Sequence, residues 1–217
     1  GESGCGKSTT GRMVLKLLDC TEGTVLYKGK DIGKMKGKEM RSLRKEMQII
    51  FQDPYASLNP RMTVKSIIQE PLILSKRFSD RGSLEAETVR LMDLVGIEER
   101  LRIAYPHELD GGRRQRVGIG RALALNPKFV VCDEPVSALD VSIQAQILNL
   151  LMDLQDEYHL TYMFITHDLS VVRHISHDIC VMYLGQLVET APSKELFEKQ
   201  LHPYSKALLS AIPSVDI

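Results

Sequence analysis

The stretch that decides the fold is GESGCGKST, residues 1–9. It matches the pattern G-x-x-x-x-G-K-[ST], whose glycines let backbone N–H groups approach phosphate oxygens. The helix that follows such a loop also points its positive N-terminal end at the phosphates. The stretch therefore predicts a nucleotide site in which Lys7 pairs with the β- and γ-phosphates, Ser8 binds Mg²⁺ and Thr9 helps to hold the α-phosphate. The residues predicted to contact the nucleotide are Gly1, Glu2, Ser3, Gly4, Cys5, Gly6, Lys7, Ser8 and Thr9.

The loop stands at the very start of the sequence, with no initiator Met and no strand before it. A phosphate-binding loop is normally held by a buried strand on its N-terminal side. We therefore expect the sequence to be a fragment of a longer protein, with further residues upstream of Gly1 and beyond Ile217.

Composition narrows the function classes. The 217 residues are 43% hydrophobic and 26% charged, which is enough for a substantial core. Lys+Arg and Asp+Glu both number 28, and this balance predicts no nucleic-acid partner. No apolar run approaches the roughly 18 residues that span a bilayer, so a membrane role must come through a partner. The four cysteines form no CxxC pair, which favours reduced thiols.

The pattern along the chain predicts an α/β fold. Helical spacing covers 10–18 and 38–46, a hairpin pattern covers 24–32, and a β-rich run covers 47–52. Helical segments without a strand follow, interrupted by Pro71, Gly82 and Pro106. Strand and helix then alternate, with helices at 113–125 and 141–158 and buried strands at 128–135 and 160–168, before the strands of DICVMYLGQLVET (178–190). We expect a parallel sheet, a small antiparallel region and an inserted helical subdomain.

The run FVVCDE, residues 129–134, is the second element that carries chemistry. An apolar strand that ends in a carboxylate is how a nucleotide-binding fold holds the Mg²⁺ shell, here through Asp133. Glu134, one residue further on, is placed to polarise the attacking water as a general base.

Together these residues resemble the ATP-binding cassette (ABC) transporter ATPases, and the resemblance implies a P-loop NTPase core. It implies that Gln52 is the Q-loop glutamine that touches Mg²⁺ and water, and that His167 is the switch histidine that contacts the γ-phosphate. It further implies that Ser137, Ala138, Leu139 and Asp140 form the D-loop at a dimer interface. The predicted catalytic residues are Glu134, His167, Lys7 and Gln52, and the predicted metal ligands are Ser8, Gln52 and Asp133. The implied domains are an ATP-binding core at 1–57 and 119–217 and a helical subdomain at 58–118.

Longer stretches look like the oligopeptide and dipeptide importers of that family: FQDPYASLNPRMTV (51–64), YPHEL (105–109), SALDVSIQAQILNLL (137–151) and HPYSKALLSAIP (202–213). This resemblance implies a second ATPase subunit, transmembrane permease subunits and an extracytoplasmic solute-binding protein as partners. It places the chain at the cytoplasmic face of the cell membrane. Peptides are the favoured solute, while related systems carry nickel and other small solutes.

The signature motif departs from the family pattern LSGGQ, because here it reads Leu109-Asp110-Gly111-Gly112-Arg113. In the family the serine faces the γ-phosphate bound by the partner subunit, so Asp110 would place an anion beside an anion. Two unit charges about 4 Å apart interact by roughly 4 kcal/mol at an effective dielectric constant of 20. Two unequal ATP sites and a heterodimer would follow. Alternatively, Asp110 simply caps the helix as well as Ser would, with Arg113 offsetting its charge.

Two other functions stay open at this point. A cassette ATPase of nucleic-acid maintenance or translation would be expected to show a long coiled-coil insertion, zinc-ligand cysteines or tandem cassettes, and none is visible. A regulatory nucleotide-binding subunit with weak hydrolysis is suggested by the altered signature, whereas the presence of Glu134 and His167 favours an active ATP hydrolase.

Overall fold

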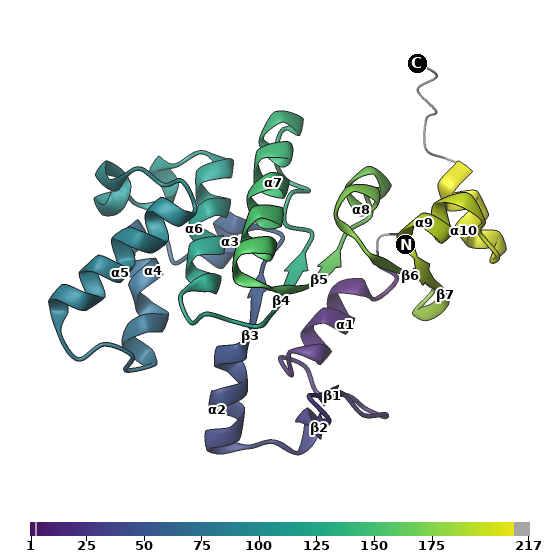
Figure 1. Cartoon of the computed structure of the whole chain (residues 1–217), viewed down its shortest axis with the longest axis horizontal. Coiled ribbons are helices and arrows are strands. Elements are labelled where there is room, and N and C mark those ends of the chain that lie inside the picture. The colour runs from purple at the N-terminus through teal and green to yellow at the C-terminus, as the bar shows by residue number, and fades with distance from the viewer. Residues whose placement is uncertain (3, 211–217) are drawn as a thin grey trace.

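The centre of the computed structural model, which describes residues 1–2 and 4–210, is a sheet of three parallel strands (Figure 1). These strands are β3 (Met47–Ile50), β4 (Phe129–Asp133) and β5 (Thr161–Ile165), in the order β3-β4-β5. The register places Met47 opposite Phe129 and Phe129 opposite Thr161. Their near-continuous apolar runs suit strands that are covered on both faces. The predicted parallel sheet is confirmed.

Helices cover both faces of this sheet. Val131 of β4 packs with Leu15, just after α1 (Lys7–Val14). Val130 and Cys132 point to the opposite face and pack with α6 (Gly111–Leu123) and α7 (Val141–Tyr158). Successive side chains of a strand alternate between faces, so one strand serves both cores. The helix α1 lies close to the sheet, because a Cβ atom at Gly11 would come within 2.8 Å of the Ile165 side chain.

A small β region follows α1. Strands β1 (Leu26–Tyr27) and β2 (Lys30–Asp31) form an antiparallel hairpin, and Lys28 and Gly29 between them have φ angles of 50° and 76°. Positive φ at both central residues is the geometry of a tight hairpin turn. After the short helix η1 (Ile32–Lys34), α2 (Gly37–Glu46) leads directly into β3. The predicted hairpin and helix are confirmed.

The helix predicted at 10–18 is wrong at both ends. It begins three residues earlier, at Lys7, because the glycine loop feeds straight into it. It ends at Val14, and Lys16 then takes a left-handed φ of 50°, which a continuing right-handed helix excludes.

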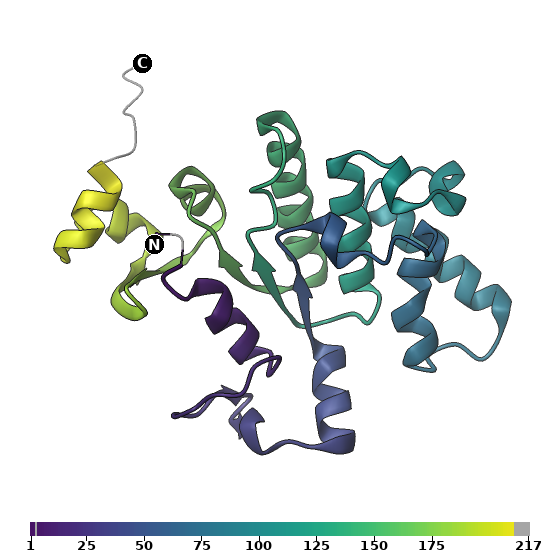
Figure 2. The same ribbon diagram turned by 180° about the vertical axis from the view of Figure 1, so that it is seen from behind.

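The helical region lies to one side of the sheet, at the left in Figure 1 and at the right when the molecule is seen from behind in Figure 2. Its elements are α3 (Pro54–Ser57), α4 (Val64–Leu74), α5 (Arg81–Leu94), η2 (Glu99–Ile103), η3 (Pro106–Glu108) and α6 (Gly111–Leu123).

The expected interruptions at Pro71 and Gly82 are wrong, since Pro71 lies inside α4 and Gly82 is the second residue of α5. A proline inside a helix costs about 3 kcal/mol, but burial of each large apolar side chain returns about 1.5–3 kcal/mol. In α4 the side chains of Ile67, Ile68 and Leu72 are all buried, so packing outweighs the local penalty.

The last part of the described chain lies beyond the β5 edge of the sheet, opposite the helical region (Figure 1). After α8 (Leu169–Ile175), strands β6 (Asp178–Tyr183) and β7 (Gln186–Pro192) pair antiparallel, and α9 (Ser193–Glu198) and α10 (Pro203–Ser210) follow. In the described residues β6 pairs with β7 and not with β5. A largely apolar cavity of about 720 Å³ lies between them, lined by β5, α8, β6 and α10.

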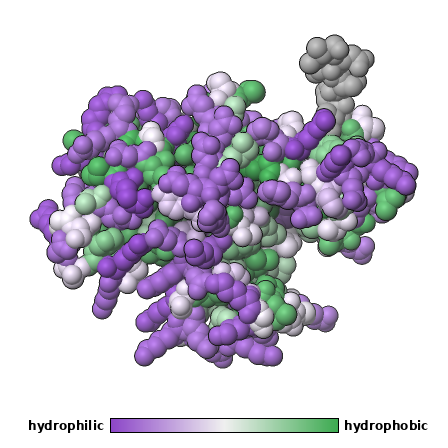
Figure 3. Space-filling view, in the orientation of Figure 1, coloured by the Kyte–Doolittle hydropathy of each residue, from purple (hydrophilic) through white to green (hydrophobic). Residues whose placement is uncertain are grey.

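The face seen in Figure 3 is mostly hydrophilic, with hydrophobic residues showing between the helices. Leu17, Leu18 and Leu26, near the end of α1 and in the hairpin, are 48%, 44% and 63% exposed. Within the described residues, no helix combines the length and the apolar character needed to cross a membrane.

Candidate active site

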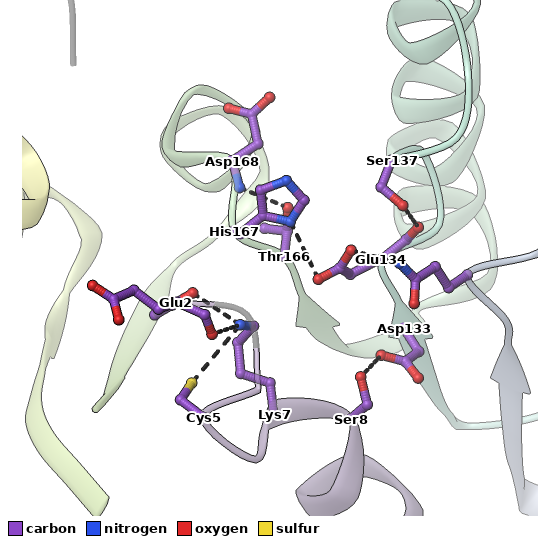
Figure 4. A network of polar contacts seen from close by, with 12 residues as sticks. Glu2, Cys5, Lys7, Ser8, Asp133, Glu134, Ser137, Thr166, His167 and Asp168 are labelled. Carbon is purple, nitrogen blue, oxygen red and sulfur yellow. Dashed lines mark hydrogen bonds and ion pairs between the residues drawn. The ribbon is translucent and has the colours of Figure 1, made fainter. Parts of the chain in front are cut away.

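The predicted catalytic residues gather at one edge of the sheet. Gln52, Glu134 and His167 follow the ends of β3, β4 and β5, and the three strands are parallel neighbours. Because the carboxyl ends of parallel strands meet at the same edge, residues distant in sequence are brought side by side there. The start of α1 faces this edge (Figure 4).

The glycine loop has the backbone that its sequence predicts. Gly4 and Gly6 have φ angles of 80° and 99°, in the left-handed region where a side chain would be strained. Gly6 directly precedes α1, so the first N–H groups of that helix point back towards the loop. This combination of free N–H groups and a positive helix end attracts phosphate.

The Lys7 side chain folds back over the loop (Figure 4). Its ammonium group donates to the backbone carbonyls of Gly1 at 2.8 Å and Glu2 at 2.6 Å, and lies 3.8 Å from the Cys5 sulfur. These carbonyls are neutral partners, so the positive charge of Lys7 is not cancelled by a carboxylate. It is therefore available to an anionic phosphate.

A hydrogen bond joins the loop to the central strand. Ser8 Oγ donates to Asp133 Oδ1 at 2.6 Å, and Asp133 is only 2% exposed. No group of three or more His, Cys, Asp or Glu residues able to hold a metal occurs in the described part of the chain. One carboxylate with one hydroxyl still fits Mg²⁺, which is usually held by one or two carboxylates together with substrate phosphates.

Glu134 is held between two polar side chains from the neighbouring strands. Gln52 Nε2 donates to Glu134 Oε2 at 2.9 Å, and His167 Nδ1 lies 3.2 Å from Glu134 Oε1. The Glu134 backbone has a φ of 46°, and its N–H donates to the carbonyl of Ile165 at 2.9 Å. A left-handed φ in a residue other than glycine costs of order 1–3 kcal/mol and is kept where the surrounding structure enforces it. The carboxylate is thus fixed in direction.

The D-loop residues lie next to Glu134 and lead into α7. Ser137 Oγ donates to the Glu134 carbonyl at 3.1 Å, so the predicted D-loop is tied to the backbone of Glu134. Ala138, Leu139 and Asp140 complete the turn, and Asp140 is the residue before the first turn of α7.

The signature residues form the start of α6. Asp110 caps this helix, because its Oδ1 accepts from the Arg113 backbone N–H at 2.7 Å, and its carboxylate lies 3.5 Å from the Arg113 guanidinium. These are the contacts that the second alternative for Asp110, the helix cap, describes. Leu109 is buried, and a Cβ atom at Gly111 or Gly112 would approach Leu139 or α7 at 3.1 Å and 2.6 Å, respectively.

Sequence reasoning missed three contacts around the site. Thr10 Oγ1 donates to the Gly6 carbonyl at 3.0 Å, and Tyr204 Oη accepts from the Glu2 N–H at 3.0 Å. Thr166 Oγ1 accepts from the Asp168 N–H at 3.0 Å, next to His167. The Thr10 bond is a usual helix feature, whereas no local pattern could reveal the Tyr204 contact. Among the predicted loop residues, Thr9 is exposed and Ser3 lies outside the described residues.

Comparison with known proteins identifies the family. A family model described as "ABC transporter" matches residues 1–137, and one described as "Oligopeptide/dipeptide transporter, C-terminal region" matches residues 188–217. The oligopeptide transport ATP-binding protein OppF of Bacillus subtilis is 54% identical over the whole chain, which covers 71% of that relative. The dipeptide transport ATP-binding protein DppF of Lactococcus lactis is 52% identical over the whole chain, which covers 70% of it. The oligopeptide transport ATP-binding protein AppF of Bacillus subtilis is 53% identical over 98% of this chain, and the match covers 65% of that relative.

Solved structures show the same fold. A dimeric post-hydrolysis structure of the ATP-binding cassette MJ0796 with ADP and Pi has a TM-score of 0.79 at 30% identity, covering 89% of this chain and 83% of that one. A structure of cbiO1 from Clostridium perfringens, part of the ABC transporter complex cbiONQ, has a TM-score of 0.81 at 28% identity, covering 92% of this chain and 78% of the other. The chain belongs to the ABC transporter family and is an ATP hydrolase of that family.

Proposed function

We propose that this chain is the ATPase subunit of a membrane importer for oligopeptides or dipeptides. Relatives named as oligopeptide and dipeptide transport proteins, 51–54% identical over essentially the whole chain, support this solute class. The chain spans 71% of the length of OppF and 65% of that of AppF, both of Bacillus subtilis, so the activity of the whole protein is part of the proposal.

The observation that carries hydrolysis is the position of Glu134 between Gln52 and His167. A carboxylate fixed by two neighbours can accept a proton from a water molecule held beside it, which is the task of a general base. Gln52 and His167 keep the carboxylate at the open edge of the sheet. In this proposal Glu134 orients and deprotonates the attacking water, and His167 contacts the γ-phosphate.

The loop and the central strand would hold the substrate, ATP. Lys7 would pair with the β- and γ-phosphates, while backbone N–H groups at the start of α1 would face them. Ser8, Asp133 and Gln52 would supply oxygen ligands for Mg²⁺, whose charge would offset that of the phosphates. Catalysis on this view is mostly positioning and charge stabilisation by these residues.

The proposed assembly contains a second ATPase subunit, transmembrane permease subunits and an external solute-binding protein. The dimeric cassette among the similar structures supports pairing of two ATPase subunits. Permease subunits would hold the chain at the cytoplasmic face of the cell membrane, and a solute-binding protein would deliver the peptide outside. The helical subdomain, residues 58–118, would transmit closure of the dimer to the permease.

Asp110 supports a heterodimer in this proposal. Its carboxylate occupies the N-terminal end of α6, where the usual serine would face the partner's ATP. The site built from Lys7, Asp133, Glu134 and His167 would then use an intact signature from a different partner chain. The opposite site, completed by Asp110, would hydrolyse ATP weakly.

The test is ATP turnover by the native complex after copurification and reconstitution into vesicles, with and without Lys7→Ala. We expect a mixture of short peptides to stimulate turnover and Lys7→Ala to abolish it. Stimulation by Ni²⁺ in place of peptides would refute the solute class. Full turnover in the Lys7→Ala complex would instead favour a regulatory subunit.

A further inference from the structure

One peptide group at the start of the phosphate loop is held from both sides. The carbonyl oxygen of Gly1 accepts from Lys7 Nζ at 2.8 Å, and the adjoining N–H of Glu2 donates to Tyr204 Oη at 3.0 Å. Both groups belong to the Gly1–Glu2 peptide bond, which is planar and stiff. Tyr204 and Lys7, 197 positions apart in the sequence, are therefore joined through a single rigid unit.

Tyr204 is itself firmly placed. Its ring lies against the ring of Tyr183 at the end of β6, with centroids 4.2 Å apart and the planes 31° from parallel. Its backbone N–H donates to His202 Nδ1 at 3.1 Å, at the first turn of α10. Burial is the largest cause of a raised pKa for Tyr204, so its hydroxyl stays protonated near neutral pH.

The segment before α10 is anchored to β7 by one carboxylate. Glu189 accepts from the backbone N–H groups of Leu201 at 2.8 Å and His202 at 3.1 Å. The C-terminal helix that carries Tyr204 is thus tied to the β6–β7 hairpin. The same hairpin touches the loop, because a Cβ atom at Gly1 would lie 2.1 Å from the Met182 carbonyl oxygen. The first residue of the loop therefore lies against the β6–β7 hairpin, to which the C-terminal helix is tied.

We propose that Tyr204 is a positioning residue for Lys7. Its hydroxyl fixes the orientation of the Gly1–Glu2 peptide, and that peptide fixes the ammonium group that meets the phosphates. The region that matches peptide-transporter C-termini would in this way tune the affinity of the loop for nucleotide. The inference rests on the proposed function in one respect, namely that residues 1–9 bind ATP.

The decisive variant is Tyr204→Phe in the full-length protein, since it keeps the stacked ring and removes only the hydroxyl. Loss of one neutral hydrogen bond typically weakens the interaction it supports by about threefold to tenfold. We expect KM and the equilibrium Kd for MgATP to rise by that factor, with kcat and Tm unchanged. Tyr183→Phe is the matched control, because it removes the hydroxyl of the stacking partner, and we expect wild-type values from it.

A second measurement reads the loop directly. Hydrogen–deuterium exchange should be faster in the loop peptide of Tyr204→Phe than in Tyr183→Phe or the wild type. The proposal is overturned if Tyr204→Phe binds MgATP and exchanges like the wild type, if kcat falls while KM is unchanged, or if Tyr183→Phe shifts KM equally. A Tm as low as that of Tyr204→Leu, which also loses the ring, would show a structural role only and overturn it too.

A failure of the proposed function can be distinguished from a failure of the role of Tyr204. Lys7→Ala in the same protein should lose MgATP binding altogether. If Lys7→Ala binds MgATP normally, the assignment of the loop is wrong, whatever Tyr204→Phe does. If Lys7→Ala loses binding while Tyr204→Phe does not change it, only the role of Tyr204 is refuted.

Discussion

Ser8 and Asp133 are 125 positions apart in the sequence, yet Ser8 Oγ donates to Asp133 Oδ1 at 2.6 Å. The bond joins the first turn of α1 to the last residue of β4. Asp133 is 2% exposed, so its carboxylate depends on protein partners rather than on water. The contact therefore serves two purposes, because it satisfies a buried carboxylate and places two candidate Mg²⁺ ligands together.

Ser8→Ala should affect both properties. Removing one partner of a buried carboxylate costs about 1–3 kcal/mol, so the free energy of unfolding without nucleotide should fall by that amount. Loss of even a group that supports a metal ligand typically lowers metal affinity or activity by about 10–100-fold. We expect a correspondingly higher Mg²⁺ concentration at half-maximal ATPase activity, measured by titration at fixed ATP.

Ser75→Ala is the control for this change. Ser75 Oγ donates to the Leu72 carbonyl at 2.9 Å in the helical region, so it also loses a hydroxyl hydrogen bond. Its Mg²⁺ titration should match that of the wild type. An unshifted titration for Ser8→Ala would remove Ser8 from the metal ligands.

Glu134→Gln should separate ATP binding from hydrolysis. The amide keeps the shape and an oxygen that can accept from Gln52, but it cannot accept the proton of water. General-base catalysis contributes about 10²–10⁴-fold, so single-turnover hydrolysis should slow by at least the lower figure. Binding of MgATP, measured by equilibrium titration, should be kept. Glu157→Gln, on the exposed surface of α7, should hydrolyse ATP at the wild-type rate.

The backbone of Glu134 gives a prediction about stability. Its φ of 46° favours glycine over any L-residue. Glu134→Gly and Glu134→Ala should both lose turnover, but the Gly variant should be the more stable by about 1 kcal/mol, because strain at such a position is of that order. Urea denaturation of the two variants without nucleotide measures the difference.

The same two substitutions at Asp153, to Gly and to Ala, should differ in stability in the opposite direction. Asp153 is exposed in the interior of α7, where glycine costs about 1 kcal/mol relative to alanine. Asp153→Gly should therefore be less stable than Asp153→Ala. If Glu134→Gly is also the less stable of its pair, the left-handed backbone at Glu134 carries no strain.

Features that depend on interactions between residues near one another in the sequence could be predicted, whereas features that depend on distant residues could not. The helix α7 was predicted with its observed bounds, 141–158, because its amphipathic run is complete within itself. Asp133 could be proposed because it ends a buried strand beside a glycine loop, whereas Gln52 and His167 were proposed only through the family resemblance. Pro71 was misjudged because burial of α4 in tertiary packing outweighs the local rule. The bond between Tyr204 and Glu2 depends on how distant segments meet, and no periodicity or spacing encodes that.

Substitutions of Asp110 should change stability and activity differently. Asp110 Oδ1 accepts from the Arg113 N–H at 2.7 Å, and serine is an equally good helix cap. Asp110→Ser should therefore keep the free energy of unfolding, whereas Asp110→Ala should lose about 1 kcal/mol as the cap is removed. Denaturation of the two variants in urea measures this difference.

In the reconstituted complex, Asp110→Ser should raise ATP turnover, because it removes an anion from the helix end proposed to face the partner's γ-phosphate. Asp110→Asn, another good cap without the charge, should raise it as well, which separates the charge from the hydroxyl. The readout is steady-state turnover together with the number of ATP molecules hydrolysed per complex in a single turnover. If both variants hydrolyse ATP like the wild type, Asp110 acts as a helix cap only, and the proposal of two unequal sites loses its support.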